Sequence, residues 1–263
     1  MTTPLRESPL LRLGVRAAPC RRIYCLPYAG GGVAPYALWF RSLPDDIEVV
    51  AAQLPGRETR LNEAAQQSIG QMVDALVPAI ESTSDLPFAI FGHSMGALIA
   101  YEVALALEQR ATRQPSHLFV SGRLSPDEPD VRPPLRDLPE SEFIAALQAR
   151  YGPIPPAVLA EPELLALLMP IVRSDIRAVE TYQWQPDSPN IRCPVTVYGG
   201  ELDRHPFPAQ LALWGRVSAN QVRVRVFPGD HFYLNTQRDA LTADIAMRWT
   251  EAALGMASSG VGG

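Results

Sequence analysis

The segment Gly92-His93-Ser94-Met95-Gly96 matches the pattern G-x-S-x-G, which places a serine in a tight turn between a strand and a helix. Glycines are needed at both ends because a side chain there would collide with the neighbouring strand or helix. An apolar run at 88–91 precedes the motif, and an Ala-, Leu- and Glu-rich segment at 97–109 follows it. The start of that helix would direct backbone N–H groups toward the serine. This context favours a nucleophilic Ser94 over a serine that only caps a helix.

A serine hydroxyl becomes a good nucleophile only when a base accepts its proton, and the chain has four histidines. His93 lies inside the motif, and we expect its side chain to point away from the Ser94 hydroxyl. His117 begins a strand, and His205 lies in a polar, proline-rich loop. His231 follows the last predicted strand, where the base lies in hydrolases with the chain order serine, acid, histidine. We therefore predict that His231 is the general base.

The carboxylate that orients this base is expected on a loop after an earlier strand. The run 195–198 reads as such a strand, and Asp203 lies in the loop that follows. We choose Asp203 to orient the imidazole and to stabilise its positive form. Glu201 is the nearest alternative, Asp127 follows an earlier strand, and Asp230 is adjacent to the histidine.

The oxyanion of an acyl-transfer intermediate needs backbone donors. The N–H of Met95, next to the nucleophile, is one candidate. The loop 27–32, Pro-Tyr-Ala-Gly-Gly-Gly, follows an early strand, and Ala29 is our choice for the second donor. We expect Tyr28 to contact the substrate. A phosphate-binding role for these glycines is disfavoured because all 23 Lys and Arg residues are arginine, so the lysine of a P-loop is absent.

These residues need a scaffold in which strands alternate with helices. Strand-like runs occur at 23–26, 48–52, 88–91, 117–120, 195–198 and 222–226, and helical patterns separate most of them. This alternation predicts the α/β class: a mostly parallel central sheet with helices on both faces, as in the α/β-hydrolase fold. We predict an N-terminal extension at 1–22, a hydrolase core at 23–124 and 190–255, and a flexible tail at 256–263.

The segment 125–189 interrupts this alternation with a Pro- and Asp-rich loop and helices expected near 140–150, 161–169 and 170–182. Ligands of open α/β sheets bind at the carboxyl ends of the strands, so we interpret this insertion as a helical lid rather than an ordinary structural subdomain.

Composition excludes several other classes. The chain has 263 residues, 47% hydrophobic residues and a formal charge of -5, without the basic run of a nucleic-acid binder. It shows no secretory signal and no apolar stretch that would span a membrane. Its three cysteines have no metal-ligand spacing. We expect a cytoplasmic protein with reduced thiols and no bound metal.

With these residues assembled, the chain resembles the type II (external, editing) thioesterases of polyketide and nonribosomal peptide assembly lines. The matching segments are Leu26-Pro27-Tyr28-Ala29-Gly30-Gly31, Leu54-Pro55-Gly56-Arg57-Glu58, Gly92-His93-Ser94-Met95-Gly96, Ser174-Asp175 with Glu180-Thr181-Tyr182, and Gly229-Asp230-His231-Phe232-Tyr233-Leu234. The resemblance implies the same triad, Ser94, Asp203 and His231, and the same oxyanion donors, Ala29 and Met95. One departure is Leu202, where a small polar or acidic residue is expected.

The resemblance also implies the substrate, an acyl group held as a thioester on the phosphopantetheine arm of a carrier protein. It implies a monomer that needs no cofactor. The alternatives are a medium-chain acyl thioesterase, a general carboxylesterase on the same fold, and a non-catalytic partner of carrier proteins. Arg57 is expected to fix its loop, and Asp175 with Tyr182 to anchor a lid helix. Arg123, Arg173 and Arg177 are candidate contacts for an acidic carrier.

Overall fold

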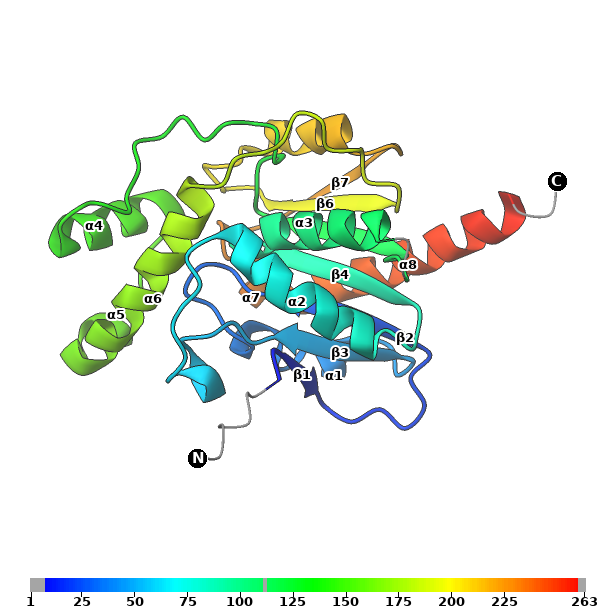
Figure 1. Ribbon diagram of the computed structural model, residues 1–263, viewed down its shortest axis with the longest axis horizontal. Coiled ribbons are helices and arrows are strands. Elements are labelled where there is room, and N and C mark those ends of the chain that lie inside the picture. Colours follow the sequence, from blue (N-terminus) through cyan, green and yellow to red (C-terminus); the bar gives the residue numbers. More distant parts are fainter. Residues whose placement is uncertain (1–7, 111–112, 260–263) are drawn as a thin grey trace.

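The computed structural model describes residues 8–110 and 113–259, which form one seven-stranded sheet in the order β1-β3-β2-β4-β5-β6-β7 (Figure 1). Its strands are β1 (Leu10–Leu13), β2 (Arg21–Leu26), β3 (Ile47–Ala52), β4 (Phe88–His93), β5 (His117–Ser121), β6 (Val195–Gly200) and β7 (Arg223–Phe227). All neighbouring pairs are parallel except β1 and β3. The prediction of a mostly parallel sheet is confirmed.

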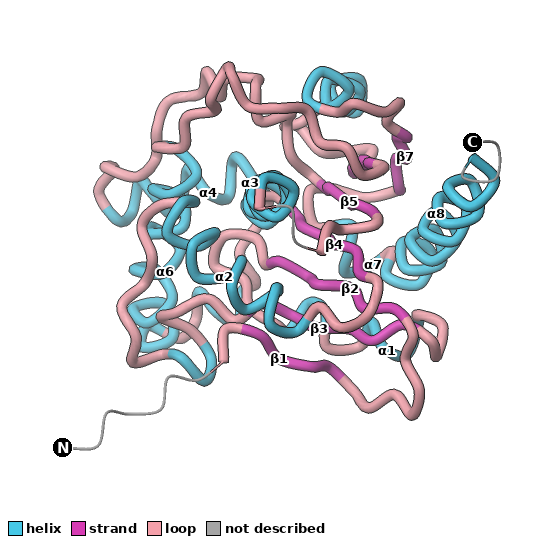
Figure 2. The backbone as a smooth tube through the Cα atoms, turned by 45° about the vertical axis from the view of Figure 1, so that its right-hand side comes forward, coloured by secondary structure: helices cyan, strands magenta, loops and turns pink. Residues whose placement is uncertain are grey.

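Helices cover both faces of the sheet (Figure 2). One face carries α2 (Ile69–Thr83) and α3 (Met95–Gln109), and the other carries α1 (Trp39–Ser42), α7 (Tyr233–Thr236) and α8 (Arg238–Ser259). Single turns of 3-10 helix occur at η1 (Ala34–Tyr36) and η2 (Glu58–Arg60), and a longer one at η3 (Pro208–Val217).

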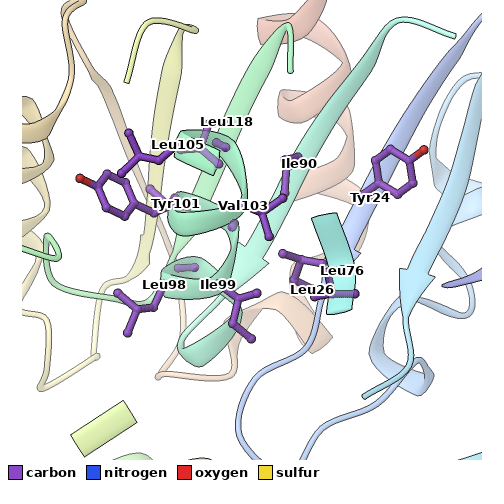
Figure 3. Close-up of a cluster of buried hydrophobic side chains, with 14 of the residues drawn as sticks. Tyr24, Leu26, Leu76, Ile90, Leu98, Ile99, Tyr101, Val103, Leu105 and Leu118 are labelled. Atoms are coloured by element: carbon purple, nitrogen blue, oxygen red, sulfur yellow. The ribbon is translucent and has the colours of Figure 1, made fainter. Parts of the chain in front are cut away.

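The strands beneath the site are buried on both faces, which explains why they read as continuous apolar runs. Every residue of β3, β4, β5 and β6 is buried. Figure 3 shows how α3 packs on this layer, with Val103 beside Ile90 of the sheet and Leu98 farther along the helix. The helix that begins at the G-x-S-x-G motif is therefore held rigidly against the sheet.

The two ends of the chain depart from the expected boundaries. Leu10–Leu13, within the predicted extension 1–22, forms an edge strand antiparallel to β3. Such a short, half-exposed strand has almost no periodic signal. Helix α8 extends into the predicted tail and ends at Ser259. The glycine at position 255 does not end it, because a glycine costs a helix only about 1 kcal/mol relative to alanine. The rest of the predicted tail, 260–263, lies outside the described residues, as do residues 1–7.

The insertion between β5 and β6 contains α4 (Glu140–Tyr151), α5 (Pro156–Leu159) and α6 (Pro162–Glu180), which lie together at one end of the molecule (Figure 1). The expectation of two helices meeting at Pro170 was wrong, because α6 runs through this proline. Proline removes one backbone hydrogen bond, but Met169 and Ile176 on either side of it pack with Phe143 of α4. Among the described residues, no helix has the length and apolar character needed to cross a membrane.

Candidate active site

Ser94 lies at a strained turn between β4 and α3. Its backbone has φ 55° and ψ −114°, a conformation that non-glycine residues rarely adopt. The flanking glycines permit this turn. A Cβ atom at Gly92 would lie 1.9 Å from the Gly96 carbonyl oxygen, and one at Gly96 would lie 2.2 Å from the Leu26 carbonyl oxygen. The motif thus forms the tight turn that its glycines predicted.

The position of Ser94 in the sheet is the one expected for a ligand site. Strand β2 lies between β3 and β4, so the chain leaves β2 toward one side of the sheet and later continues toward the other. The carboxyl ends of β2 and β4 therefore form a topological switch point, where open α/β sheets bind ligands. Ser94 follows β4, and the loop 27–32 follows β2.

His231 and Asp203 form a buried pair. The Nδ1 atom of His231 lies 2.8 Å from Oδ2 of Asp203, and both side chains are almost fully buried. The backbone N–H of His205 donates to the other Asp203 oxygen at 3.1 Å. Because Nδ1 faces the carboxylate, the proton belongs on Nδ1, and Nε2 is left as the basic atom. His231 and Ser94 line the same cavity without a direct hydrogen bond, a common arrangement before substrate binds.

The other carboxylates considered from the sequence have different surroundings, although Asp230 also lines the cavity. Glu201 and Asp230 are exposed, and Asp230 accepts a hydrogen bond from the Phe232 N–H. Asp127 accepts from Ser125 and lies near Arg216. Only Asp203, of these four, is bonded to the His231 ring. The unexpected residue beside it, Leu202, is 69% exposed, so its apolar character leaves the pair intact.

His93 and His117 are engaged in the scaffold. His93 is fully buried, and its Nδ1 lies 2.8 Å from the Ser121 hydroxyl, which bonds in turn to Tyr233. Burial holds the pKa of His93 well below its usual value. His117 lies 2.9 Å from the Thr196 hydroxyl, and burial lowers its pKa to about 3. These histidines are neutral and do not reach the cavity that Ser94 lines.

Two backbone donors of the Ser94 cavity have no hydrogen-bond partner within the described residues. Met95 is the first residue of α3, so its N–H has no partner within the helix. The N–H of Ala29 makes no hydrogen bond within the described part of the chain. The next two N–H groups do: Gly30 donates to Asp175, and Gly31 donates to the Tyr28 carbonyl oxygen. Ala29 and Met95 both line the cavity with Ser94. Tyr28 lines it too, and its ring packs edge-on against Phe232 at 5.1 Å.

An ion pair that the sequence did not reveal holds the loop 27–32, which carries Ala29, against the insertion. Arg57 donates to both oxygens of Asp175 on α6, at 2.8 and 2.9 Å, and also to the Gly31 carbonyl oxygen at 2.9 Å. Asp175 in turn accepts from the Gly30 N–H at 2.7 Å. Asp175 and Tyr182 were expected to anchor the insertion to the core: Asp175 does so through Arg57, and Tyr182 donates separately to Glu102 of α3. The sequence held one indication of this ion pair, because Arg57 and Asp175 both lie in segments that match the family.

Removal of the Asp175 charge is expected to lower both the stability of the protein and its turnover rate. Asp175→Asn leaves the buried Arg57 unpaired, which costs about 3 kcal/mol of stability. It also loosens the loop that carries Ala29, and we expect kcat to fall about tenfold or more. Steady-state rates at a temperature where the variant is folded measure this effect.

Asp244→Asn is the matched control, because Asp244 is equally buried and bonds to Tyr198 and Arg225 away from the cavity. It should lower the stability and leave kcat near that of the wild type. A wild-type kcat in Asp175→Asn would contradict the positioning role.

The cavity beside Ser94 has a volume of about 520 Å³, within the usual range for small-molecule sites. The insertion supplies most of its apolar wall, from residues of α4, α5 and α6 and the loop between them: Leu147, Ile154, Val158, Leu168, Met169, Val172, Ile176 and Val179. The core supplies the polar groups around the serine. An apolar chain thus fits against the insertion while its reactive carbonyl lies at Ser94. Among the described residues, no group of three or more His, Cys, Asp or Glu could hold a metal ion.

Comparisons with known proteins point to one family. A profile of the thioesterase domain matches residues 21–248. The gramicidin S biosynthesis protein GrsT of Aneurinibacillus migulanus is 38% identical over 220 residues, which cover 84% of this chain and 85% of GrsT. The solved structure of RedJ, a thioesterase from the prodiginine biosynthetic pathway in Streptomyces coelicolor, has a TM-score of 0.80 and 36% identity, covering 88% of this chain and 86% of RedJ. YbtT, a type II thioesterase from the yersiniabactin NRPS/PKS pathway, has a TM-score of 0.82 and 28% identity, covering 93% of this chain and 99% of YbtT.

Proposed function

This chain belongs to the thioesterase domain family, and on that premise we propose that it hydrolyses acyl thioesters carried on the phosphopantetheine arms of carrier proteins in polyketide or nonribosomal peptide synthesis. We assign Ser94 as the nucleophile, His231 as the general base, Asp203 as the orienting acid, and the Ala29 and Met95 N–H groups as oxyanion donors. The observation that carries this proposal is the cavity that joins Ser94 and His231 to an apolar wall.

Acylation begins when Nε2 of His231 accepts the Ser94 proton as the hydroxyl oxygen attacks the thioester carbonyl carbon. The carbonyl oxygen becomes an oxyanion, which the N–H groups of Ala29 and Met95 stabilise. Asp203 stabilises the imidazolium through Nδ1. The carbon–sulfur bond then breaks, the imidazolium protonates the departing thiol, and an ester links the acyl group to Ser94.

Deacylation repeats these steps with water as the nucleophile. His231 accepts a proton from the water, the hydroxide attacks the ester carbonyl, and the Ser94 oxygen leaves with the proton held on the imidazolium. The products are a carboxylic acid, a free carrier thiol and the regenerated enzyme. All the proton transfers use groups of this chain, so the reaction as written involves no cofactor.

We also propose that α4, α5 and α6 act as a lid that holds the acyl chain while its carbonyl group lies at Ser94. Their apolar side chains form the wall opposite Ser94. The contact between Arg57 and Asp175 supports this role, since these two side chains also bond to Gly31 and Gly30 and so tie α6 to the loop that carries Ala29.

The decisive experiment compares one acyl group on a carrier-bound phosphopantetheine arm with the same acyl group in a simple oxygen ester. We expect a clear preference in kcat/KM for the carrier thioester, measured as free acid released. Cleavage of the oxygen ester alone would instead identify a general carboxylesterase.

A series of straight-chain acyl groups on the same carrier separates the remaining alternatives. An editing enzyme is expected to accept short and medium chains with similar rates. A sharp optimum at medium chain length would favour a medium-chain thioesterase that releases fatty acids as product. Binding of the loaded carrier with no release of acid would indicate a non-catalytic partner.

A further inference from the structure

Arg123 lies at the junction of two cavities, two residues beyond the end of β5. It lines the 520 Å³ cavity beside Ser94 and a second cavity of about 470 Å³ under the loop that leads into the insertion. Val179 of α6 is the other residue that lines both. Arg123 therefore borders the cavity in which a molecule bound at Ser94 would lie.

The acidic side chains around the second cavity are already paired with other arginines. Both oxygens of Asp130 accept hydrogen bonds from Arg132. Glu180 pairs with two arginines and also accepts hydrogen bonds from two backbone N–H groups. Asp127 and Glu128 both pair with a single arginine at the rim of the cavity. These contacts are Glu180 with Arg136 and Arg150, and Asp127 and Glu128 with Arg216. The carboxylates of the second cavity therefore do not neutralise Arg123 by direct contact.

The Arg123 side chain makes no hydrogen bond and no ion pair with any part of the chain that the structure describes. Its backbone, in contrast, is fixed, because its carbonyl oxygen accepts from the Trp214 indole N–H at 2.9 Å. Burial lowers the pKa of the guanidinium, yet an arginine stays protonated at neutral pH. A partly buried cation without a partner carries a desolvation cost that a bound acceptor would offset.

The other two arginines considered as carrier contacts, unlike Arg123, have side-chain partners. Arg173 donates to the carbonyl oxygens of Arg136 and Leu138 and lies over the Phe143 ring, and Arg177 pairs with Asp137. Both hold the insertion together. Arg123 alone of the three lines the cavity next to Ser94.

We propose that Arg123 determines substrate specificity by binding an acceptor oxygen, a carbonyl or a carboxylate, on the acyl group whose thioester lies at Ser94. This inference rests on the proposed function. The rest of the acyl wall is largely apolar, so the guanidinium supplies a charge-assisted hydrogen bond that a purely hydrocarbon chain cannot use. The preferred substrates are therefore oxygenated acyl groups rather than plain alkyl chains.

The test uses two sets of matched thioesters of N-acetylcysteamine, which lacks the phosphate of the natural arm. The long set contains 5-methylhexanoyl, 5-oxohexanoyl and glutaryl groups, which share one branched shape and differ only in the terminal atoms. The short set contains 3-methylbutanoyl, 3-oxobutanoyl and malonyl groups. The wild type and Arg123→Met are compared by kcat/KM on each thioester.

In at least one set, we expect Arg123→Met to lower kcat/KM for the two oxygenated members by about tenfold or more, and for the hydrocarbon member by less than about threefold. Arg216→Met is the matched control, because it removes an exposed arginine that contacts Glu128 at the rim of the second cavity. It should leave the profile of both sets unchanged. Thermal unfolding should show that Arg123→Met is folded, since the bond from Trp214 goes to the backbone.

Equal losses across all members of both sets, or no loss at all, would overturn the inference. Equal losses would mean that Arg123 acts on the common arm or on the fold rather than on the acyl oxygen. Hydrolysis of the hydrocarbon members by the wild type reports the thioesterase activity separately. Failure of the Arg123 inference is thereby distinguished from failure of the proposed function.

Discussion

Replacement of Ser94 by alanine is expected to lower kcat for a carrier-bound thioester by about 10⁴-fold or more, because no other nucleophile forms the acyl-enzyme. The substitution keeps the same strained backbone and removes only the hydroxyl, so thermal unfolding should be close to that of the wild type. Release of free acid from the loaded carrier, followed under single-turnover conditions, measures the loss.

Two further measurements make this prediction specific. Ser84→Ala removes a buried serine that bonds to the Glu81 carbonyl oxygen at the end of α2, away from the cavity, and kcat should remain near the wild-type value. Ser94→Ala should still bind the loaded carrier, because the cavity walls are unaltered. Substantial turnover by folded Ser94→Ala would refute the assignment of the nucleophile.

Asp203→Asn is expected to lower kcat by about 10³- to 10⁴-fold with little change in fold. An amide N–H at this position would donate to Nδ1 of His231, which places the ring proton on Nε2 and removes the base that faces the cavity. The loss should therefore fall on kcat rather than on KM. Steady-state kinetics on an acyl N-acetylcysteamine thioester provide the measurement.

The neighbouring carboxylates serve as controls for this assignment. Glu201→Gln and Asp230→Asn alter exposed residues that do not bond to the His231 ring, so each should retain kcat within about tenfold of the wild type. If Asp230→Asn lost activity and Asp203→Asn did not, the orienting acid would have to be reassigned.

The sequence alone predicted the features that arise from short segments of chain. The strand, the turn with glycines on either side of Ser94, and the helix after it are local, and the structure contains each of them. The alternation of strands and helices predicted a mostly parallel sheet, because crossover helices return the chain to the same edge. His231 was proposed from chain order, and the four carboxylates could only be ranked.

The tertiary structure decided which distant side chains meet. The bond from His231 to Asp203 distinguishes that acid from its three rivals, since it depends on how the loops after β6 and β7 pack. Arg57 and Asp175, separated by 118 positions in the chain, meet only when α6 lies against the loop after β3. Within the described residues the Arg123 side chain has no partner, whereas Asp130 and Glu128 of the second cavity pair with other arginines.

The same limit explains the errors at the boundaries. Proline and glycine signals are local, and they predicted a break at Pro170 and a flexible tail from 256. Packing of the apolar side chains around Pro170 against α4 outweighs one lost hydrogen bond, so α6 continues. Local patterns thus determined the chemistry available to this protein, and long-range packing decided which side chains meet, because side-chain contacts between distant segments leave no periodic trace in the sequence.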